Sequence, residues 1–359
     1  MNTTASEIWR TQGSSLPGRR GPLSGWVLAR LVEAEETPSC RSDEAFSEAL
    51  ARAASDPALA LGDDDLHLAL YLSLEVHYRS FPETGHRLEW DPALLECRVA
   101  LEQVFLDGLA RAVIAPDPEP ERVAEALFEL AASDEMPSLS RWIERSADLA
   151  QFREFAIHRS AYQLKEADPH SWLIPRLTAK AKVALLEVQF DEYGGGQVDR
   201  MHSALYAKTM RTLALADAEN AYLDCLPGAT LATVNLISVL SLRANMRGAA
   251  VGHLAMFEIT SAAPNRRYGN ALRRLGFDAD ATDFYDEHVE ADSVHENIAA
   301  HDLAGSLAQA EPELAGQILF GAGALLELDR RFTEYLLGAW KGGMTSLLAL
   351  PGGAVDSTP

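Results

Sequence analysis

The distribution of apolar and polar residues along the chain predicts helices throughout. Helical patterns cover, among others, residues 91–114, 149–165, 175–193 and 312–340, where apolar positions follow the period of an amphipathic helix rather than that of a strand. No run of alternating apolar and polar residues is long enough to predict a sheet, and no convincing internal repeat is found. The sequence therefore predicts an all-α protein.

Proline and glycine divide these helices. Asp91-Pro92 is typical of an N-cap followed by proline at the first helical position, and three glycines from Gly194 end the helix before them. Residues 264–267 are expected to form a turn between two helices. We expect four parts, namely a flexible arm (1–24), an N-terminal helical region (25–140), a second helical domain (141–345) and a flexible tail (346–359).

Residues 283–302, DFYDEHVEADSVHENIAAHD, form the most informative stretch. On a helix, His288, Asp292 and His295 occupy positions i, i+4 and i+7, so their side chains share one narrow stripe. Two imidazoles and one carboxylate are a ligand set for a divalent transition metal. The alternative interpretation is a solvated acidic helix on which the two histidines align by chance.

Further ligand candidates lie upstream. Glu258 stands between Phe257 and Ile259 in an apolar helix, where a carboxylate is costly unless it is paired or bound to metal. The alternative is a glutamate on the polar face of a two-sided helix. The helix 175–193 carries Glu187, Asp191 and Glu192 near its C-terminus, where the helix dipole disfavours negative charge unless a cation is near.

His202, in the first turn of the following helix, completes the set of candidates. Oxygen and nitrogen ligands without a thiolate favour iron or manganese over structural zinc. The number of side chains suits two ions with one bridging carboxylate, for which we take Glu258. The full set is Glu192, His202, Glu258, His288, Asp292 and His295.

Composition narrows the possible functions and the cellular location of the protein. A net charge of −22 argues against a nucleic-acid groove and against binding to anionic membranes. The cysteines Cys40, Cys97 and Cys225 are far apart, odd in number and without a CxxC pair, so we expect reduced thiols. The N-terminus has no apolar signal region, and the most apolar stretches are too short to span a bilayer. We therefore expect a cytoplasmic protein.

The ordered set of residues resembles a known family. His288-x3-Asp292-x2-His295, a lone Glu258 upstream and the earlier pair Glu192 and His202 are similar to the haem-oxygenase-like diiron oxidases and oxygenases, which are iron-containing redox enzymes. The resemblance covers roughly residues 150–345. It implies a haem-oxygenase-like seven-helix bundle, preceded here by the additional N-terminal helical region.

The resemblance also implies a site and a chemistry. The six residues would hold two Fe2+ ions, with Glu187 or Asp191 as substitutes for Glu192 and no catalytic group beyond the ligands. Dioxygen would be the co-substrate, and a peroxo-diferric intermediate would oxidise an amino-acid-like or fatty-acid-like small molecule. An external electron donor would reset the ions, manganese remains an alternative to iron, and the N-terminal extension would pack on the core or form a homodimer interface.

Two other interpretations stay open, namely a metal-free haem-oxygenase-like oxidase and a non-catalytic helical interaction protein. Four arginines near the ends of the metal-bearing helices are candidates for binding a substrate carboxylate, although surface salt bridges are their commoner role. They are Arg243, Arg247, Arg266 and Arg267. Glu75 and His77 are interpreted as structural or surface residues, because residues two apart do not face each other on a helix.

Overall fold

The computed structural model describes residues 16–32, 39–79, 81, 85–133 and 138–349. All regular secondary structure within these ranges is helical, so the predicted all-α class is confirmed. None of the helices described there combines the length and the apolar character needed to cross a membrane.

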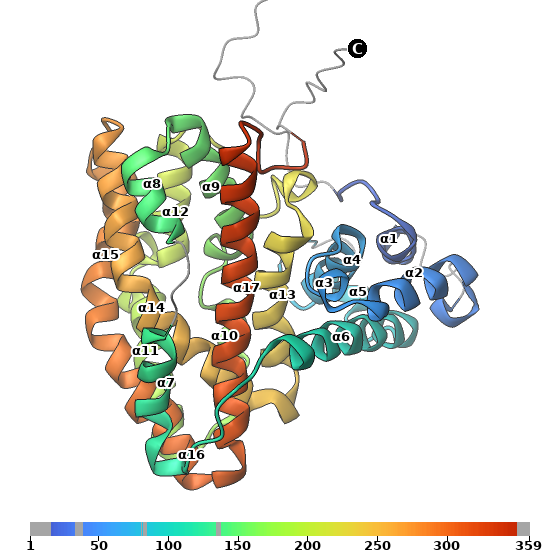
Figure 1. The fold of residues 1–359 in the computed structure, drawn as a ribbon, viewed down its shortest axis with the longest axis horizontal. Coiled ribbons are helices and arrows are strands. Elements are labelled where there is room, and N and C mark those ends of the chain that lie inside the picture. Colours follow the sequence, from blue (N-terminus) through green and yellow to red (C-terminus); the bar gives the residue numbers. More distant parts are fainter. Residues whose placement is uncertain (1–15, 33–38, 80, 82–84, 134–137, 350–359) are drawn as a thin grey trace, which may run out of the picture.

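The first six helices gather on one side of the molecule (Figure 1). They are α1 (Pro22–Val32), α2 (Glu44–Ser55), α3 (Pro57–Ala60), α4 (Asp64–Glu75), α5 (Gly85–Leu88) and α6 (Pro92–Ala112). Helix α4 lies at their centre, since it packs on α1 and α6 and also on α13 of the second group. Every residue from Asp65 to Glu75 is buried, as expected for a helix that is apolar nearly all round.

The remaining helices form the bundle on the other side of Figure 1. They are α7 (Val123–Ala132), α8 (Leu139–Ser146), α9 (Leu149–Gln163), α10 (Asp168–Ser171), α11 (Ala179–Glu192), α12 (His202–Thr212), α13 (Gly228–Leu242), α14 (Arg247–Arg274), α15 (Ala279–Asn297), α16 (Ser306–Ala310) and α17 (Ala315–Lys341). A π-helical segment, Ile298–Gly305, follows α15. Although α7 precedes the expected boundary at residue 140, it packs on α14, α17 and this π-helical segment.

Short 3-10 turns connect many of these helices. They are Cys40–Ser42, Pro120–Arg122, Ile174–Arg176, Gly194–Gly196, Val198–Arg200, Leu223–Cys225, Ala244–Met246 and Pro312–Leu314.

Helix α14 continues through Pro264 without interruption, so the turn expected at residues 264–267 is wrong. A proline inside a helix removes one backbone hydrogen bond and costs about 3 kcal/mol. Helix α14 packs against α8, α15 and α17, and the apolar surface buried there outweighs that cost. The position of a proline in the sequence does not by itself reveal this compensation.

Both described chain ends are held against the bundle. The backbone N–H of Gly18 donates to Asp224 at 2.8 Å. The hydroxyl of Ser346, the first residue of the predicted tail, is buried and donates to Glu154 at 2.6 Å. The rest of the predicted arm (1–15) and tail (350–359) lies outside the described residues.

A buried ion pair joins the two groups of helices. Lys165, just after α9, pairs with Glu75 at the end of α4, and both side chains are buried. The Lys165 ammonium also lies 3.4 Å from the hydroxyl of Tyr71. His77 pairs instead with Glu89 at 3.2 Å, so Glu75 and His77 both have structural partners in this region.

Two glycines set the close approach of α14 and α17. A Cβ atom on Gly252 would overlap the carbonyl oxygen of Ile318, and one on Gly321 would overlap the carbonyl oxygen of Ala249. Because both obstacles are rigid backbone atoms, neither can move aside as a side chain could.

We expect Gly321→Ala to lower the free energy of unfolding by about 2–3 kcal/mol, because the added methyl group forces two packed helices apart. Gly338→Ala is the matched control on the same helix, where a Cβ meets no atom within 4 Å, and it should be neutral or stabilising by up to about 1 kcal/mol. Urea unfolding of both variants measures the difference. Equal midpoints would contradict the close backbone contact.

Candidate metal centre

Five segments bring acidic and imidazole side chains into the interior of the bundle. Glu166 follows the end of α9, Glu192 is the last residue of α11 and His202 is the first residue of α12. Glu258 lies within α14. His288 and His295 lie on α15, seven residues or about two turns apart, so both face the same side of that helix.

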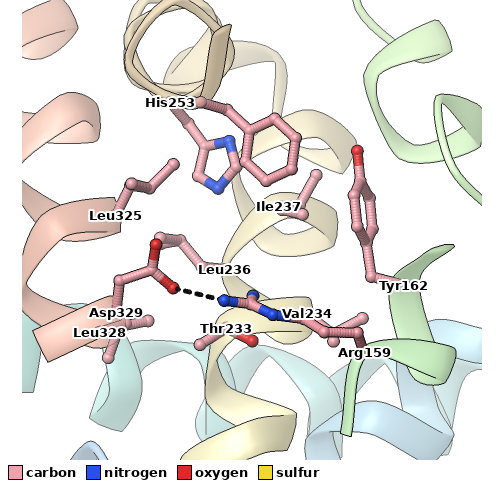
Figure 2. A pocket seen from close by; sticks show the side chains of 11 residues that line it. Arg159, Tyr162, Thr233, Val234, Leu236, Ile237, His253, Leu325, Leu328 and Asp329 are labelled. Atoms are coloured by element: carbon pink, nitrogen blue, oxygen red, sulfur yellow. Dashed lines mark ion pairs between the residues drawn. The ribbon is translucent and has the colours of Figure 1, made fainter. Parts of the chain in front are cut away.

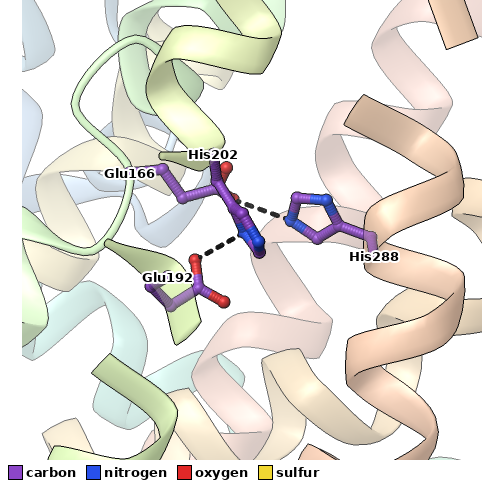
Figure 3. Close-up of side chains that lie close together, drawn as sticks. All are labelled: Glu166, Glu192, His202 and His288. Carbon is purple, nitrogen blue, oxygen red and sulfur yellow. Dashed lines mark ion pairs between the residues drawn. The ribbon is translucent and has the colours of Figure 1, made fainter. Parts of the chain in front are cut away.

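The first group of side chains consists of Glu166, Glu192, His202 and His288, all of them buried. One potential ligand atom from each lies within 4.8 Å of the others. Nδ1 of His202 is 2.9 Å from Glu192, and Nε2 of His288 is 3.5 Å from Glu166. Figure 3 shows His288 reaching from α15 toward the three side chains on the opposite side.

The second group consists of Glu192, Glu258 and His295, again buried and within 4.8 Å of one another. Nδ1 of His295 lies 3.6 Å from Glu258. Glu192 therefore belongs to both groups. We had taken Glu258 as the shared carboxylate, but Glu258 belongs to the second group only, because α14 carries it to the side of His295 rather than of His202.

Five of the six predicted ligands thus converge, whereas the sixth is not described. Asp292 lies in α15, but its side chain is outside the described residues, so its role as a ligand stays a prediction. Of the two substitutes proposed for Glu192, Glu187 is exposed on α11. Asp191 is half exposed and accepts a hydrogen bond from the far side of His295 at 3.0 Å.

Hydrogen bonds on their outer sides orient two of the histidines. Nδ1 of His288 lies 2.8 Å from the carbonyl oxygen of Phe284, and Nε2 of His295 lies 3.0 Å from Asp191. A nitrogen that donates outward leaves the other ring nitrogen as a lone pair for a metal. The lone pairs then belong to Nε2 of His288 and Nδ1 of His295, which are the atoms that face Glu166 and Glu258.

The electrostatics of the cluster are unfavourable without a cation. Burial raises the pKa of Glu166, Glu192 and Glu258 above the ordinary range of a carboxyl. Burial alone would lower the pKa of His295, but the carboxylates of Glu258 and Asp191 raise it to about 9. Among the described residues, neither carboxylate oxygen of Glu166 has a hydrogen-bond partner. Such groups are rare in folded proteins, and a bound ion is one of the arrangements that satisfy them.

Glu166 is the residue that sequence reasoning missed. The helix was expected to end at Lys165, before Asp168-Pro169, which left Glu166 in the connecting turn. A signal was nevertheless present, since Glu166 stands four residues after Tyr162 and eleven after Phe155. These spacings put its carboxylate on the apolar face of the preceding helix, where a charge needs a partner.

The candidate substrate-binding arginines have other partners. Arg243 is in an ion pair with Glu102, and Arg247 pairs with Glu311. Arg267 donates to Ser140 at 3.0 Å, and Arg266 is exposed. The ion pairs of Arg243 and Arg247 correspond to the commoner role considered for these arginines.

Comparison with known proteins agrees with this geometry. A family model described as "Iron-containing redox enzyme" matches residues 153–330, about half of the chain. This part of the chain belongs to the iron-containing redox enzyme family. The matched range includes the residues of both groups, from Glu166 to His295, and the bundle is consistent with the haem-oxygenase-like fold expected for such a domain.

The chain is also similar to a nitrosourea synthase from Streptomyces achromogenes subsp. streptozoticus. The two are 26% identical over 172 residues, which cover 48% of this chain and 35% of the relative. The chain thus matches about a third of the length of that curated relative.

The donors of the two groups fit iron ions. Carboxylate and imidazole ligands in a helical bundle, with no thiolate, suit iron in this family of redox enzymes. The unsatisfied oxygens of Glu166 and the oriented lone pairs of His288 and His295 point in the same direction.

We expect Asp191→Ala to weaken the binding of one iron ion by about tenfold or more, because a carboxylate that orients a ligating histidine is typically worth that much in metal affinity. Glu187→Ala is the matched control, since it removes the same charge from the exposed face of the same helix. Competition with a chromogenic iron chelator measures the affinity. Equal effects of the two substitutions would show that Asp191 acts only through its charge.

Proposed function

We propose that the protein is a non-haem diiron, dioxygen-dependent oxidase or oxygenase that acts on a small molecule. The observation that carries the proposal is the position of Glu192, a buried carboxylate shared by two groups of ligand atoms. A shared carboxylate between two such groups is the arrangement by which helical bundles hold a pair of ions.

Each ion would have its own ligands in addition to Glu192. Glu166, His202 and His288 would hold the first ion, and Glu258 and His295 would hold the second, with Asp292 as its further predicted ligand. When bound, two ferrous ions supply the electrons and open coordination positions with which dioxygen is activated for oxidation of a substrate.

Apolar and aromatic residues line part of a small cavity at the cluster. Tyr162, Ala167, Leu254 and Phe257 line a small cavity together with Glu192, Glu258 and His288. Burial and the nearby carboxylates raise the pKa of Tyr162 well above its ordinary value, so its phenol stays neutral and keeps its proton. Tyr162 thereby places one neutral hydroxyl group in the lining of this cavity.

Two features favour this proposal over a metal-free oxidase or an interaction protein. In either of those the three buried carboxylates would have only the neighbouring histidines as counter-charges, which leaves a cost in stability. The relative is named for forming a nitrosourea, a nitrogen-rich product, which favours an amino-acid-like substrate over a fatty-acid-like one. An external electron donor and a cytoplasmic location remain part of the proposal.

Iron content tests the proposal directly. After anaerobic loading with Fe(II) and removal of loosely bound metal, we expect about two iron ions per chain, because the two groups share one carboxylate. Glu192→Ala should lose most of both ions, since it removes the shared ligand, whereas Glu166→Ala should keep about one. Elemental analysis by plasma mass spectrometry gives the counts.

Glu187→Ala and His77→Ala are controls that should retain the full iron content. Glu187 shares α11 with Glu192 but is exposed, and His77 pairs with Glu89 outside the cluster. An iron-free wild-type protein under all loading conditions would overturn the proposal. An equal loss in Glu192→Ala and Glu187→Ala would move the site away from the cluster.

Iron should also order α15. Without a cation, the mutual repulsion of Glu166, Glu192 and Glu258 opposes their close packing against this helix. We therefore expect amides from about Asp280 to Asp302 to gain more protection than the rest of the bundle when Fe(II) is added, since metal binding orders its ligands. Hydrogen exchange with and without Fe(II) under anaerobic conditions measures this. Unchanged protection would mean that the site is rigidly preformed or is not a metal site.

A further inference from the structure

A second cavity lies beside the metal centre, between α9, α13, α14 and α17. Its lining includes Arg159 and Tyr162 from α9, His253 and Phe257 from α14, and Asp329 from α17. Figure 2 shows the Arg159 guanidinium and the Asp329 carboxylate facing each other across the cavity, while His253 lies further along the wall. The cavity volume is about 30 Å³, room for about one water molecule, so a larger ligand can enter only if the side chains of Arg159 and Asp329 move apart.

The cation of Arg159 is held in place by aromatic rings. Its guanidinium lies 4.6 Å from the centre of the Phe332 ring and 5.8 Å from that of Phe155. Such stacking fixes the guanidinium plane, and the N–H edge that faces Asp329 is the one that a ligand carboxylate could use. Arg159 is therefore pre-oriented before any ligand arrives.

The ion pair of Arg159 and Asp329 is loose. Their closest atoms are 3.7 Å apart, which is longer than the 2.7–2.9 Å or so of a charge-assisted hydrogen bond. The two side chains are 24% and 40% exposed, and a pair at this exposure contributes little to stability. A ligand carrying both charges could replace it at small cost, because each side chain would exchange one counter-charge for another.

Two aromatic residues connect this cavity to the cluster. Tyr162 and Phe257 line both cavities, and their rings meet edge to face at 5.6 Å. Phe257 immediately precedes Glu258 in α14. A group anchored at Arg159 and Asp329 would therefore direct its other end past Tyr162 and Phe257 toward the candidate ligands.

We propose that this cavity binds the head group of an α-amino acid, with its carboxylate on Arg159, its ammonium on Asp329 and its side chain directed toward the metal centre. The inference rests on the proposed function, because it names the class of molecule that this centre would oxidise. It assigns to Arg159 and Asp329 a role in binding and positioning the substrate.

The charges of the cavity discriminate against the other candidate class. A fatty acid would satisfy Arg159 but would place its carboxylate beside Asp329, and like charges at this separation repel. It would also leave Asp329 without the cation that it now faces. A simple amine has the opposite defect at Arg159. A zwitterion alone matches both side chains, which gives specificity by both attraction and repulsion.

Binding to the intact chain tests the proposal. The standard protein L-amino acids, with L-ornithine and L-citrulline, are screened by thermal shift against iron-loaded protein under anaerobic conditions, and any amino acid that binds is then measured by calorimetry. Its α-carboxamide and its N-acetyl derivative serve as head-group controls. We expect at least one amino acid to bind and both derivatives to bind at least about tenfold more weakly, since each loses a charge-assisted contact.

Substitutions then assign the contacts. Arg159→Gln and Asp329→Asn should each weaken binding by at least about tenfold, and Asp329→Asn should affect the N-acetyl derivative much less than the parent amino acid. Arg331→Gln is the matched control, because Arg331 lies on α17 and pairs with Glu327 instead of lining the cavity. Circular dichroism and iron content show whether each variant remains folded and loaded.

The proposal is overturned if no amino acid binds the iron-loaded protein, if the derivatives bind as well as the parent, or if Arg159→Gln and Arg331→Gln behave alike. Failure of the proposed function has a different signature, which is a chain without iron. Amino-acid binding to a chain without iron would support the head-group site and leave the metal centre in error.

Discussion

The arrangement of the bundle depends on the burial of three carboxylates beside histidines, without a lysine or arginine partner among the ion pairs of the described residues. Glu166, Glu192 and Glu258 are all nearly inaccessible to water, and burial opposes the ionisation of each. Three such groups within reach of one another would drive the helices apart if nothing neutralised them. The histidines beside them can donate a proton to a carboxylate or a lone pair to a metal ion. Bound cations would resolve the conflict, and the helices that carry these residues bring the ligand atoms close enough to hold them.

Contacts elsewhere in the structure hold the segments that carry Glu166 and Glu258 in position. Glycines at the crossing of α14 and α17 allow a backbone contact that holds the helix of Glu258 deep in the bundle. On the other side, Lys165 is bound to Glu75 of α4 and is the residue directly before Glu166. The N-terminal helices therefore do more than cover one face, because they fix the turn from which Glu166 enters the cluster. Breaking the buried pair would leave a charge uncompensated at this turn.

The parts of the site that were predictable from sequence are those that depend on one helix. The spacing of His288 and His295 places both on one stripe of α15 whatever the rest of the fold does, and an acidic residue inside an apolar helix marks Glu258. The parts that were not predictable depend on contacts between segments. Glu166 lies where a helix ends, and the sequence could not show that the chain turns there toward α15.

The same distinction, between what one helix determines and what contacts between segments determine, applies to the predictions for the arginines and for Pro264. Arginines near Glu258 in sequence were considered for the substrate because nearness in sequence was the only measure at hand, yet Arg243 and Arg247 point to acidic partners. Arg159, which lines the neighbouring cavity, is on a different helix and nearly a hundred residues earlier. Pro264 was expected to end a helix because its local cost is known, whereas the compensating packing of α14 is a property of the whole bundle.

Two histidines lie where the two cavities approach each other. His253 lines the amino-acid cavity and His170 lines the cavity at the cluster, and their rings approach to 3.3 Å between Nδ1 of His253 and Nε2 of His170. Burial lowers the pKa of His170 to about 3 and that of His253 well below its ordinary value, so both are neutral near pH 7. A neutral wall adds no field of its own at the cluster. The charges at Arg159 and Asp329 can thus select a zwitterion, while the affinity of the cluster for iron is set by its own carboxylates and histidines.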